Sequence, residues 1–295
     1  MERILKGAWM LAAALALSAS LGAQARGADA AGTEAPKFVG REACASCHAE
    51  VHETFDKTFH GRKAQSNPKL ANMCESCHGP GSAHADGGGD ITKILNPKKM
   101  SPQAVTDTCL SCHKDKNLML WKTGSHANSD VSCTTCHSVH KGSGNKSLTA
   151  GATDTCLKCH KKQKADMRLA SHHPVLEGKM TCASCHNPHG GIEGNLKADS
   201  LAETCAKCHT DKMGPFMHEH PPVADGCQNC HLPHGSTNER MLKMPIQFLC
   251  VSCHNKEHAS FTTNTTTQAT WVQRDRCTDC HREVHGSDRA RRFRK

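Results

Sequence analysis

The chain has 295 residues and 20 cysteines, but only 3% of its residues are aromatic and none is a tyrosine. This composition excludes an ordinary globular domain with a large core made of protein alone. The formal net charge of +9 would by itself favour nucleic acid or an anionic membrane as a partner.

Residues 1–25 have the pattern of a secretory signal peptide. Arg3 and Lys6 precede an apolar run over about residues 7–20, and a signal-peptidase site follows near residue 25, alternatively near residue 30. A membrane span needs about 20 apolar residues, so this run is short for one, and no later segment reaches that length. No cysteine stands at the cleavage site to carry a lipid. The sequence predicts a periplasmic protein with one domain, 26–295, and no helical membrane anchor.

Every cysteine belongs to a Cys-x-x-Cys-His pentad. The cysteines are Cys44, Cys47, Cys74, Cys77, Cys109, Cys112, Cys133, Cys136, Cys156, Cys159, Cys182, Cys185, Cys205, Cys208, Cys227, Cys230, Cys250, Cys253, Cys277 and Cys280. The pentad is the attachment signature of a c-type haem: two thiols on about one helical turn reach the porphyrin vinyl groups, and the histidine lies under the iron. Zinc sites and disulfides also use cysteine pairs, but neither explains ten histidines in the same position. The sequence therefore predicts ten covalently attached c-type haems.

Ten bound haems would change the net charge of the protein and supply its apolar core. Loss of Glu2, Arg3 and Lys6 with the signal peptide leaves +8, and two propionates per haem add about 20 negative charges, so the holoprotein is expected to be acidic and the nucleic-acid interpretation loses its support. The arginine-rich run 289–295 is interpreted as a solvated segment, with a docking role as the alternative. Because the haems supply the apolar core, we expect the haem-free chain to be largely unfolded.

The pentads recur in pairs. Alternate pentads start at Cys109, Cys156, Cys205 and Cys250, with periods of 47, 49 and 45 residues. This spacing predicts two-haem units over about 40–90, 105–145, 152–195, 201–240 and 246–290, stacked on one another. Alternating apolar runs are absent, so we expect an elongated multihaem c-type cytochrome of loops and short α-helices with negligible β-structure and the haems as its core.

The histidines decide whether an iron has an open position. The ten proximal histidines of the pentads are His48, His78, His113, His137, His160, His186, His209, His231, His254 and His281. Thirteen others remain, from which the predicted distal ligands are His60, His84, His126, His140, His172, His189, His220, His234, His258 and His285. His52, His173 and His218 are then left over.

Two arguments support this distal set. His140, His189 and His234 follow a proximal histidine by three residues, so they cannot reach the far face of the same haem and must cap a neighbouring one. His172 is preferred to His173, and His220 to His218, by aligning two His-x-Pro-Val motifs. Met180 or Met213 could serve one iron instead, and methionine ligation would raise its potential.

The arrangement resembles the MtrA/DmsE family of decahaem c-type cytochromes, with its export signal, ten pentads and Cys-His-x-Pro-His-Gly motifs, here at 185–190 and 230–235. The resemblance covers about residues 40–285. It implies an electron carrier with bis-histidine haems, threaded through an outer-membrane β-barrel porin and passing electrons between quinol-linked periplasmic or inner-membrane cytochromes and an outer-surface cytochrome or reductase. A closed barrel suits a water-soluble protein crossing hydrocarbon.

Three other functions remain open at this point. A multihaem reductase needs an open or specially ligated haem, which ten identical pentads do not offer. A carrier that supplies an extracellular terminal reductase, such as dimethyl sulfoxide reductase, differs only in its partner. A subunit of a cytochrome filament would borrow ligands from the next chain, which an internal histidine surplus makes unnecessary. The sequence does not give the direction of electron flow.

Overall fold

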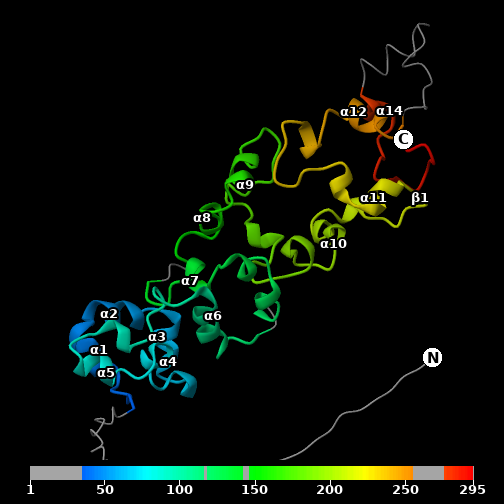
Figure 1. Cartoon of the computed structure of the whole chain (residues 1–295). Coiled ribbons are helices and arrows are strands. Elements are labelled where there is room, and N and C mark those ends of the chain that lie inside the picture. The colour runs from blue at the N-terminus through cyan, green and yellow to red at the C-terminus, as the bar shows by residue number, and fades with distance from the viewer. Residues whose placement is uncertain (1–34, 116–117, 142–145, 255–275, 295) are drawn as a thin grey trace, which may run out of the picture. The chain divides into compact units, whose positions relative to one another are not determined.

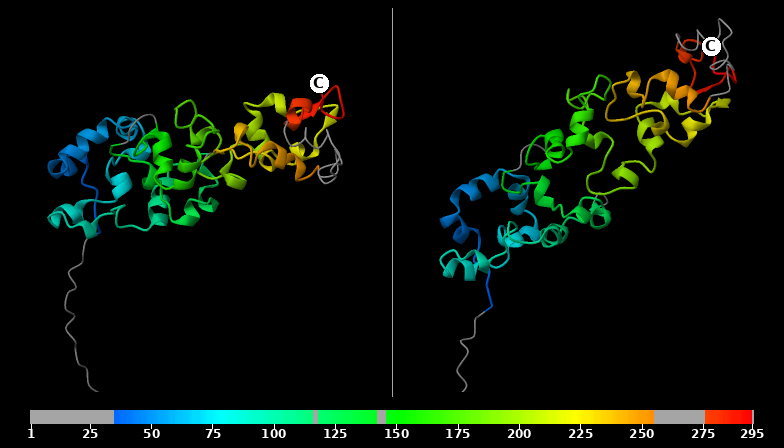
Figure 2. Two further views of the ribbon diagram at one scale, coloured as in Figure 1. Left: turned by 90° about the horizontal axis from the view of Figure 1, so that it is seen from above. Right: turned by 45° about the horizontal axis from the view of Figure 1, so that its top comes forward.

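The computed structural model describes residues 35–115, 118–141, 146–254 and 276–294, so the expected signal peptide lies outside the described residues. The described chain consists of one- to two-turn helices joined by loops (Figures 1 and 2). The α-helices are α1 (Arg41–Cys47), α2 (Ala49–Asp56), α3 (Phe59–Ala64), α4 (Glu75–His78), α5 (Ser82–Asp86), α6 (Pro102–Leu110), α7 (Cys133–Cys136), α8 (Ala152–Leu157), α9 (Lys161–Asp166), α10 (Leu201–Ala206), α11 (Pro221–Asp225), α12 (Ile246–Val251) and α14 (Cys277–Cys280).

Single 3₁₀ turns of three residues lie between the α-helices of the described chain. They are η1 (Pro68–Leu70), η2 (Ile91–Lys93), η4 (Trp121–Thr123), η5 (Ala127–Ser129), η7 (Cys182–Ser184), η8 (Glu193–Asn195), η9 (Thr210–Lys212), η10 (Cys227–Asn229) and η11 (Glu239–Met241). In the described ranges the β-structure is one antiparallel pair, β1 (His218–Glu219) with β2 (Gly286–Ser287), and four isolated bridges. The expectation of short helices, loops and negligible β-structure is confirmed.

Local sequence explains where the helices begin. Ser101 accepts a hydrogen bond from the Ala104 amide at the start of α6, and Pro102 follows at the first helical position. Ser200 caps α10 in the same way, through the amide of Glu203. Each of these helices carries the first cysteine of a pentad near its end, so the cap fixes where the thiols lie.

The protein core is small. Within the described residues the buried apolar side chains are Ala64, Val105, Trp121, Leu157, Met167, Val175 and Leu242. Large apolar side chains are exposed, among them Phe248 at 65% and Met217 at 75%. So much uncovered apolar surface in a folded chain indicates that another apolar component completes the core.

Glu75 connects the first helices by hydrogen bonds. Its buried carboxylate accepts from the amides of Val39, Gly40 and Gly81 at 3.0, 3.0 and 2.7 Å. These bonds hold the start of α1 against α4, and Cys44 on α1 therefore lies near Cys74 at the start of α4. No helix among the described residues is long and apolar enough to cross a membrane.

Candidate metal centres

The ten pentads share one local geometry. In each, the histidine amide donates to the carbonyl of the first cysteine at 2.9–3.1 Å, which closes one helical turn. The first, third, fifth, seventh and ninth pentads begin within α1, α6, α8, α10 and α12, and the others form or adjoin the single turns α4, α7, η7, η10 and α14. The two thiols of every pentad therefore lie on one turn, and all twenty are free. We number the sites 1 to 10 in chain order.

Nine of the ten proximal histidines face a second histidine. The pairs are His48–His84, His113–His60, His78–His140, His160–His126, His137–His189, His209–His173, His186–His234, His254–His220 and His231–His285, with ring centroids 5.7–6.3 Å apart. When two imidazoles bind the same metal ion from opposite sides, each through a nitrogen at about 2 Å, their ring centroids are roughly 6 Å apart. The separation fits an iron between the rings.

Backbone hydrogen bonds set which ring nitrogen is available. The Nδ1–H groups of His78, His84, His126, His137, His173, His186, His220, His231 and His281 donate to main-chain carbonyls at 2.6–2.9 Å. A carbonyl only accepts, so Nδ1 carries the proton and Nε2 keeps its lone pair for a metal. A fixed tautomer of this kind is characteristic of metal-binding histidines.

Burial also keeps several of these rings neutral. It lowers the pKa of His140, His189 and His234, with the facing proximal histidine as a smaller second cause. Burial likewise lowers the pKa of His60 and His285. A neutral imidazole is the form that binds a metal.

The ring geometry favours His173 over His172, the residue preferred from the sequence, as the partner of His209. The His173 ring faces His209 at 6.2 Å. His172 instead donates from Nδ1 to the Leu169 carbonyl at 2.5 Å and contacts the Glu177 carboxylate through Nε2 at 3.0 Å, and the Glu177 hydrogen bond raises its pKa. With both nitrogens engaged, His172 has none left for a metal.

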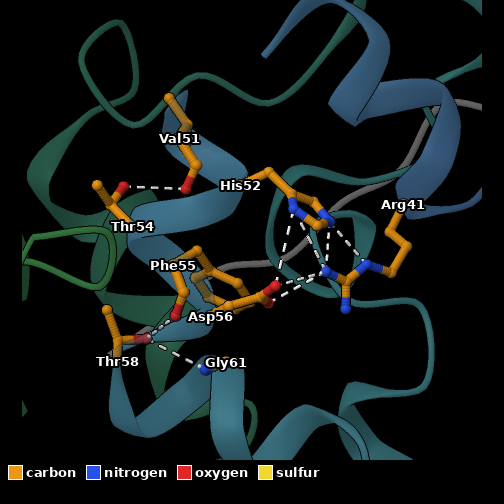
Figure 3. Close-up of polar contacts among 8 residues, drawn as sticks. All are labelled: Arg41, Val51, His52, Thr54, Phe55, Asp56, Thr58 and Gly61. Carbon is orange, nitrogen blue, oxygen red and sulfur yellow. Dashed lines mark hydrogen bonds and ion pairs between the residues drawn. The ribbon is translucent and has the colours of Figure 1, made fainter. Parts of the chain in front are cut away.

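His52 and His218, which were also left over in the sequence analysis, are not members of these nine pairs. In Figure 3, Arg41 of α1 reaches across to His52 and Asp56 of α2. Arg41 Nε donates to His52 Nε2 at 2.8 Å, and its Nη2 donates to the Asp56 carboxylate at 2.8 and 3.1 Å. This contact uses the nitrogen that a metal would need and holds α1 against α2. His218 lies in β1, opposite Ser287.

Site 10 is described in part. His281 has the same kind of Nδ1 hydrogen bond as the proximal histidines of sites 2, 4, 6 and 8, here to the carbonyl of Arg292. His258, the remaining predicted distal ligand, lies outside the described residues.

The histidines that face the proximal histidines of sites 2, 4, 6 and 8 come from farther along the chain. His140, His189 and His234 follow the proximal histidines of sites 4, 6 and 8 and lie opposite those of sites 2, 4 and 6. His285, four residues after His281, lies opposite His231 of site 8. Each of these sites is therefore completed by the second site after it.

The glycine of the Cys-His-x-Pro-His-Gly motif has a structural reason. Gly190 and Gly235 have φ of +122° and +158°. A Cβ at Gly190 would collide with the carbonyl of Leu120, and one at Gly235 with that of Asp166. Only glycine therefore lets the loop carrying His189 or His234 come this close to the preceding segment.

Consecutive sites are also neighbours through their sulfur atoms. The first cysteines approach within each pair of sites: Cys44–Cys74, Cys109–Cys133, Cys156–Cys182, Cys205–Cys227 and Cys250–Cys277. Between pairs, the second cysteines interact electrostatically: Cys77 with Cys112, Cys136 with Cys159, Cys185 with Cys208 and Cys230 with Cys253. Helix packing agrees, because α6 contacts α7, α8 contacts η7 and α12 contacts α14. Each of the nine steps from site 1 to site 10 is therefore represented by an interaction between two thiols.

The surroundings fit a large planar group that carries carboxylates. Two buried side-chain nitrogens in the described chain, Trp121 Nε1 and His60 Nδ1, have no partner. The Trp121 ring lies 6.2 Å from that of His189, so its N–H is a donor available at site 4. Together with the uncovered apolar side chains, these orphaned nitrogens fit a haem with its propionates. No group of three or more His, Cys, Asp or Glu side chains in the described ranges is arranged around a single metal ion.

Comparison with known proteins gives consistent matches. A family model described as a doubled CXXCH motif matches residues 172–214 and 220–259, and one described as cytochrome c-type protein, NrfB-like, matches residues 74–150. The chain is 37% identical over 201 residues to the multihaem cytochrome MtrA of Shewanella baltica (strain OS185), which covers 66% of this chain. The chain spans 60% of that relative's length.

Proposed function

Since the chain belongs to the multihaem c-type cytochromes, we propose that it is a periplasmic decahaem electron-transfer protein. Its ten haems form one wire between periplasmic or inner-membrane electron carriers and the outer membrane or cell surface. The predicted signal peptide supports the compartment, and the similarity to MtrA supports the class of protein.

The unbroken sequence of neighbouring sites carries this proposal. Each of the nine consecutive steps joins two pentads whose thiols interact, by hydrogen bonding within a pair of sites and electrostatically between pairs. Because those thiols would bind the porphyrin edges, we infer that consecutive haems are neighbours. Electrons then move by short steps in chain order, and each haem is needed for transport from one end to the other.

Paired histidines favour a carrier over an enzyme. The cysteines hold the porphyrins, and the proximal and distal histidines hold the irons at nine sites, with His258 proposed for site 10. The bound haems supply one-electron chemistry. Backbone hydrogen bonds fix nine of the imidazoles and burial restrains five others, and the pairs would keep both faces of an iron covered. Little rearrangement accompanies each electron, and no iron is left open to a substrate.

The proposed partners follow from this role. A β-barrel porin of the outer membrane would surround the cytochrome, because a chain with polar loops cannot lie in hydrocarbon unless a closed barrel shields it. An outer-surface cytochrome or reductase would exchange electrons at one end and a quinol-linked cytochrome at the other. The haem propionates make the holoprotein acidic, which disfavours nucleic acid as a partner.

Removal of one central haem tests the wire. A variant with Cys156→Ala and Cys159→Ala is expected to bind nine haems and to lose the end-to-end current of single holoproteins held between two electrodes, because site 5 joins sites 4 and 6. His218→Ala, which removes a histidine outside the pairs, is the matched control and should conduct as the wild type does. Unchanged current in the nine-haem variant contradicts the wire. If the reduced wild-type protein turned over nitrite, hydroxylamine or sulfite above a free-haem background, the protein would be a reductase rather than a carrier.

A further inference from the structure

The arginine-rich run near residue 290 folds back onto the last described pentad. After each of three earlier even-numbered pentads, the chain makes a turn whose carbonyl accepts from the proximal Nδ1–H. The bonds are His137 to Lys146, His186 to Gly194 and His231 to Arg240, at 2.8, 2.8 and 2.9 Å. In every case a short bridge links the same proximal histidine to a leucine just beyond the turn, at Leu148, Leu196 and Leu242.

The backbone of these turns is nearly identical. The residue after each accepting carbonyl has a left-handed conformation: Ser147, Asn195 and Met241 have φ of 51°, 53° and 56°. Its own carbonyl accepts from the amide that follows the proximal histidine, at 2.7 Å in all three copies. This conformation is uncommon for residues other than glycine, so its recurrence at one position marks a repeated structural unit.

The arginine-rich run is a further copy of this turn. His281 donates from Nδ1 to the Arg292 carbonyl at 2.6 Å, and the next residue, Phe293, has φ of 53°. The Phe293 carbonyl accepts from the amide of Glu283 at 3.1 Å, two residues after the proximal histidine rather than one, so this copy differs from the other three by one residue in register. Ser287, which is 1% exposed, fixes the intervening loop by accepting from the amides of Arg289 and Ala290. The arginine side chains at 289, 291, 292 and 294 remain exposed.

This copy also contacts site 9. The Phe293 ring lies 5.2 Å from the His220 ring at an angle of 52°. His220 faces His254 at 6.1 Å, and its Nδ1–H donates to the Val284 carbonyl of the same segment at 2.8 Å. Residues 282–293 therefore hold the proximal imidazole of site 10 and the distal imidazole of site 9.

We propose that residues 289–294 are a ligand-holding turn that positions the imidazoles of sites 9 and 10. The Arg292 carbonyl makes His281 a stronger donor to iron, which favours the ferric state and lowers the reduction potential of that haem. The Phe293 ring restrains the rotation of His220. This inference depends on haem attachment at sites 9 and 10 but not on the partner or the direction of electron flow.

Two shortened variants of the holoprotein distinguish the effect of the turn from the effect of its positive charges. A holoprotein ending at Arg291 lacks the accepting carbonyl and the Phe293 ring, whereas one ending at Phe293 keeps both. The first should show at least one haem with a more positive potential in a spectroscopic redox titration and an altered low-spin signal in electron paramagnetic resonance. The second should match the wild type in both measurements, although it has lost two positive charges.

Two side-chain variants complete the test and do not depend on the shortened chain folding. Phe293→Ala keeps the carbonyl and removes the ring, so we expect a change in the low-spin signal of site 9 alone. Arg291→Gln with Arg294→Gln removes charge and should leave all potentials and signals as in the wild type. Wild-type potentials in the chain ending at Arg291, or an effect of the double Gln variant equal to that of the truncation, would overturn the proposal.

Discussion

Replacing His173 with alanine is expected to convert one haem from six-coordinate low-spin to five-coordinate high-spin. His173 faces His209, and its Nδ1–H is bound to the Pro233 carbonyl, so its Nε2 is directed to the iron of site 7. The adjacent His172 is not positioned to replace it, because its ring nitrogens are held by Leu169 and Glu177. Electron paramagnetic resonance of the oxidised holoprotein would show a new high-spin signal from one haem in ten.

His172→Ala is the matched control, one residue away and of the same type. It removes an exposed hydrogen bond to Glu177 and should leave all haems low-spin and the haem count unchanged. The opposite pattern, with a high-spin signal in His172→Ala and none in His173→Ala, would contradict the pairing in the structure and restore the ligand expected from the sequence.

Loss of the haems is expected to unfold the chain almost completely. The described residues bury few apolar side chains, and their helices are shorter than the roughly 12 residues that an isolated helix needs for stability in water. The free energy that holds these turns in place therefore comes from haem attachment and burial.

The measurement is far-ultraviolet circular dichroism of chain produced without haem, under reducing conditions, beside the holoprotein. We expect the helical signal and the cooperative thermal transition to disappear. Cys44→Ser with Cys47→Ser, which removes only the first haem, should keep most of both. A haem-free chain with holoprotein-like helicity and a cooperative transition would show that the protein core is sufficient.

Local features of this fold could be predicted from the sequence because they depend on short spacings. A Cys-x-x-Cys-His pentad closes one helical turn wherever it occurs, as the hydrogen bonds from the ten histidine amides show. Seryl residues such as Ser101 and Ser200 mark helix starts by the same local physics. The low aromatic content correctly indicated that the chain alone makes a small core.

The pairing of histidines depends on contacts about 60 residues apart, which spacing does not reveal. His126, His173 and His220 donate to the carbonyls of Pro188, Pro233 and Val284, and each carbonyl directly precedes the distal histidine of an even-numbered site. This common register identifies His173 as the equivalent of His220. In the sequence, both stand directly before a proline, whereas counting back from the valine had selected His172.

The role that we propose for the arginine-rich run could not be predicted from the sequence for a related reason. Its exposed side chains agree with a solvated segment, but the structural role lies in the main chain of Arg292 and in the Phe293 ring. Carbonyl acceptors leave no trace in composition or charge. The glycines after His189 and His234 were visible in the sequence, yet their reason, the approach to Leu120 and Asp166, appears only in the folded chain.

The central claim is that ten haems, each with two histidine ligands, form one continuous carrier. The most direct test is low-temperature electron paramagnetic resonance of the oxidised protein, with the haem content of the same sample determined by the pyridine haemochrome method. We predict ten haems per chain, all low-spin. Fewer haems, or a high-spin signal from the wild-type protein, would contradict the claim by showing an interrupted wire or an iron open to substrate.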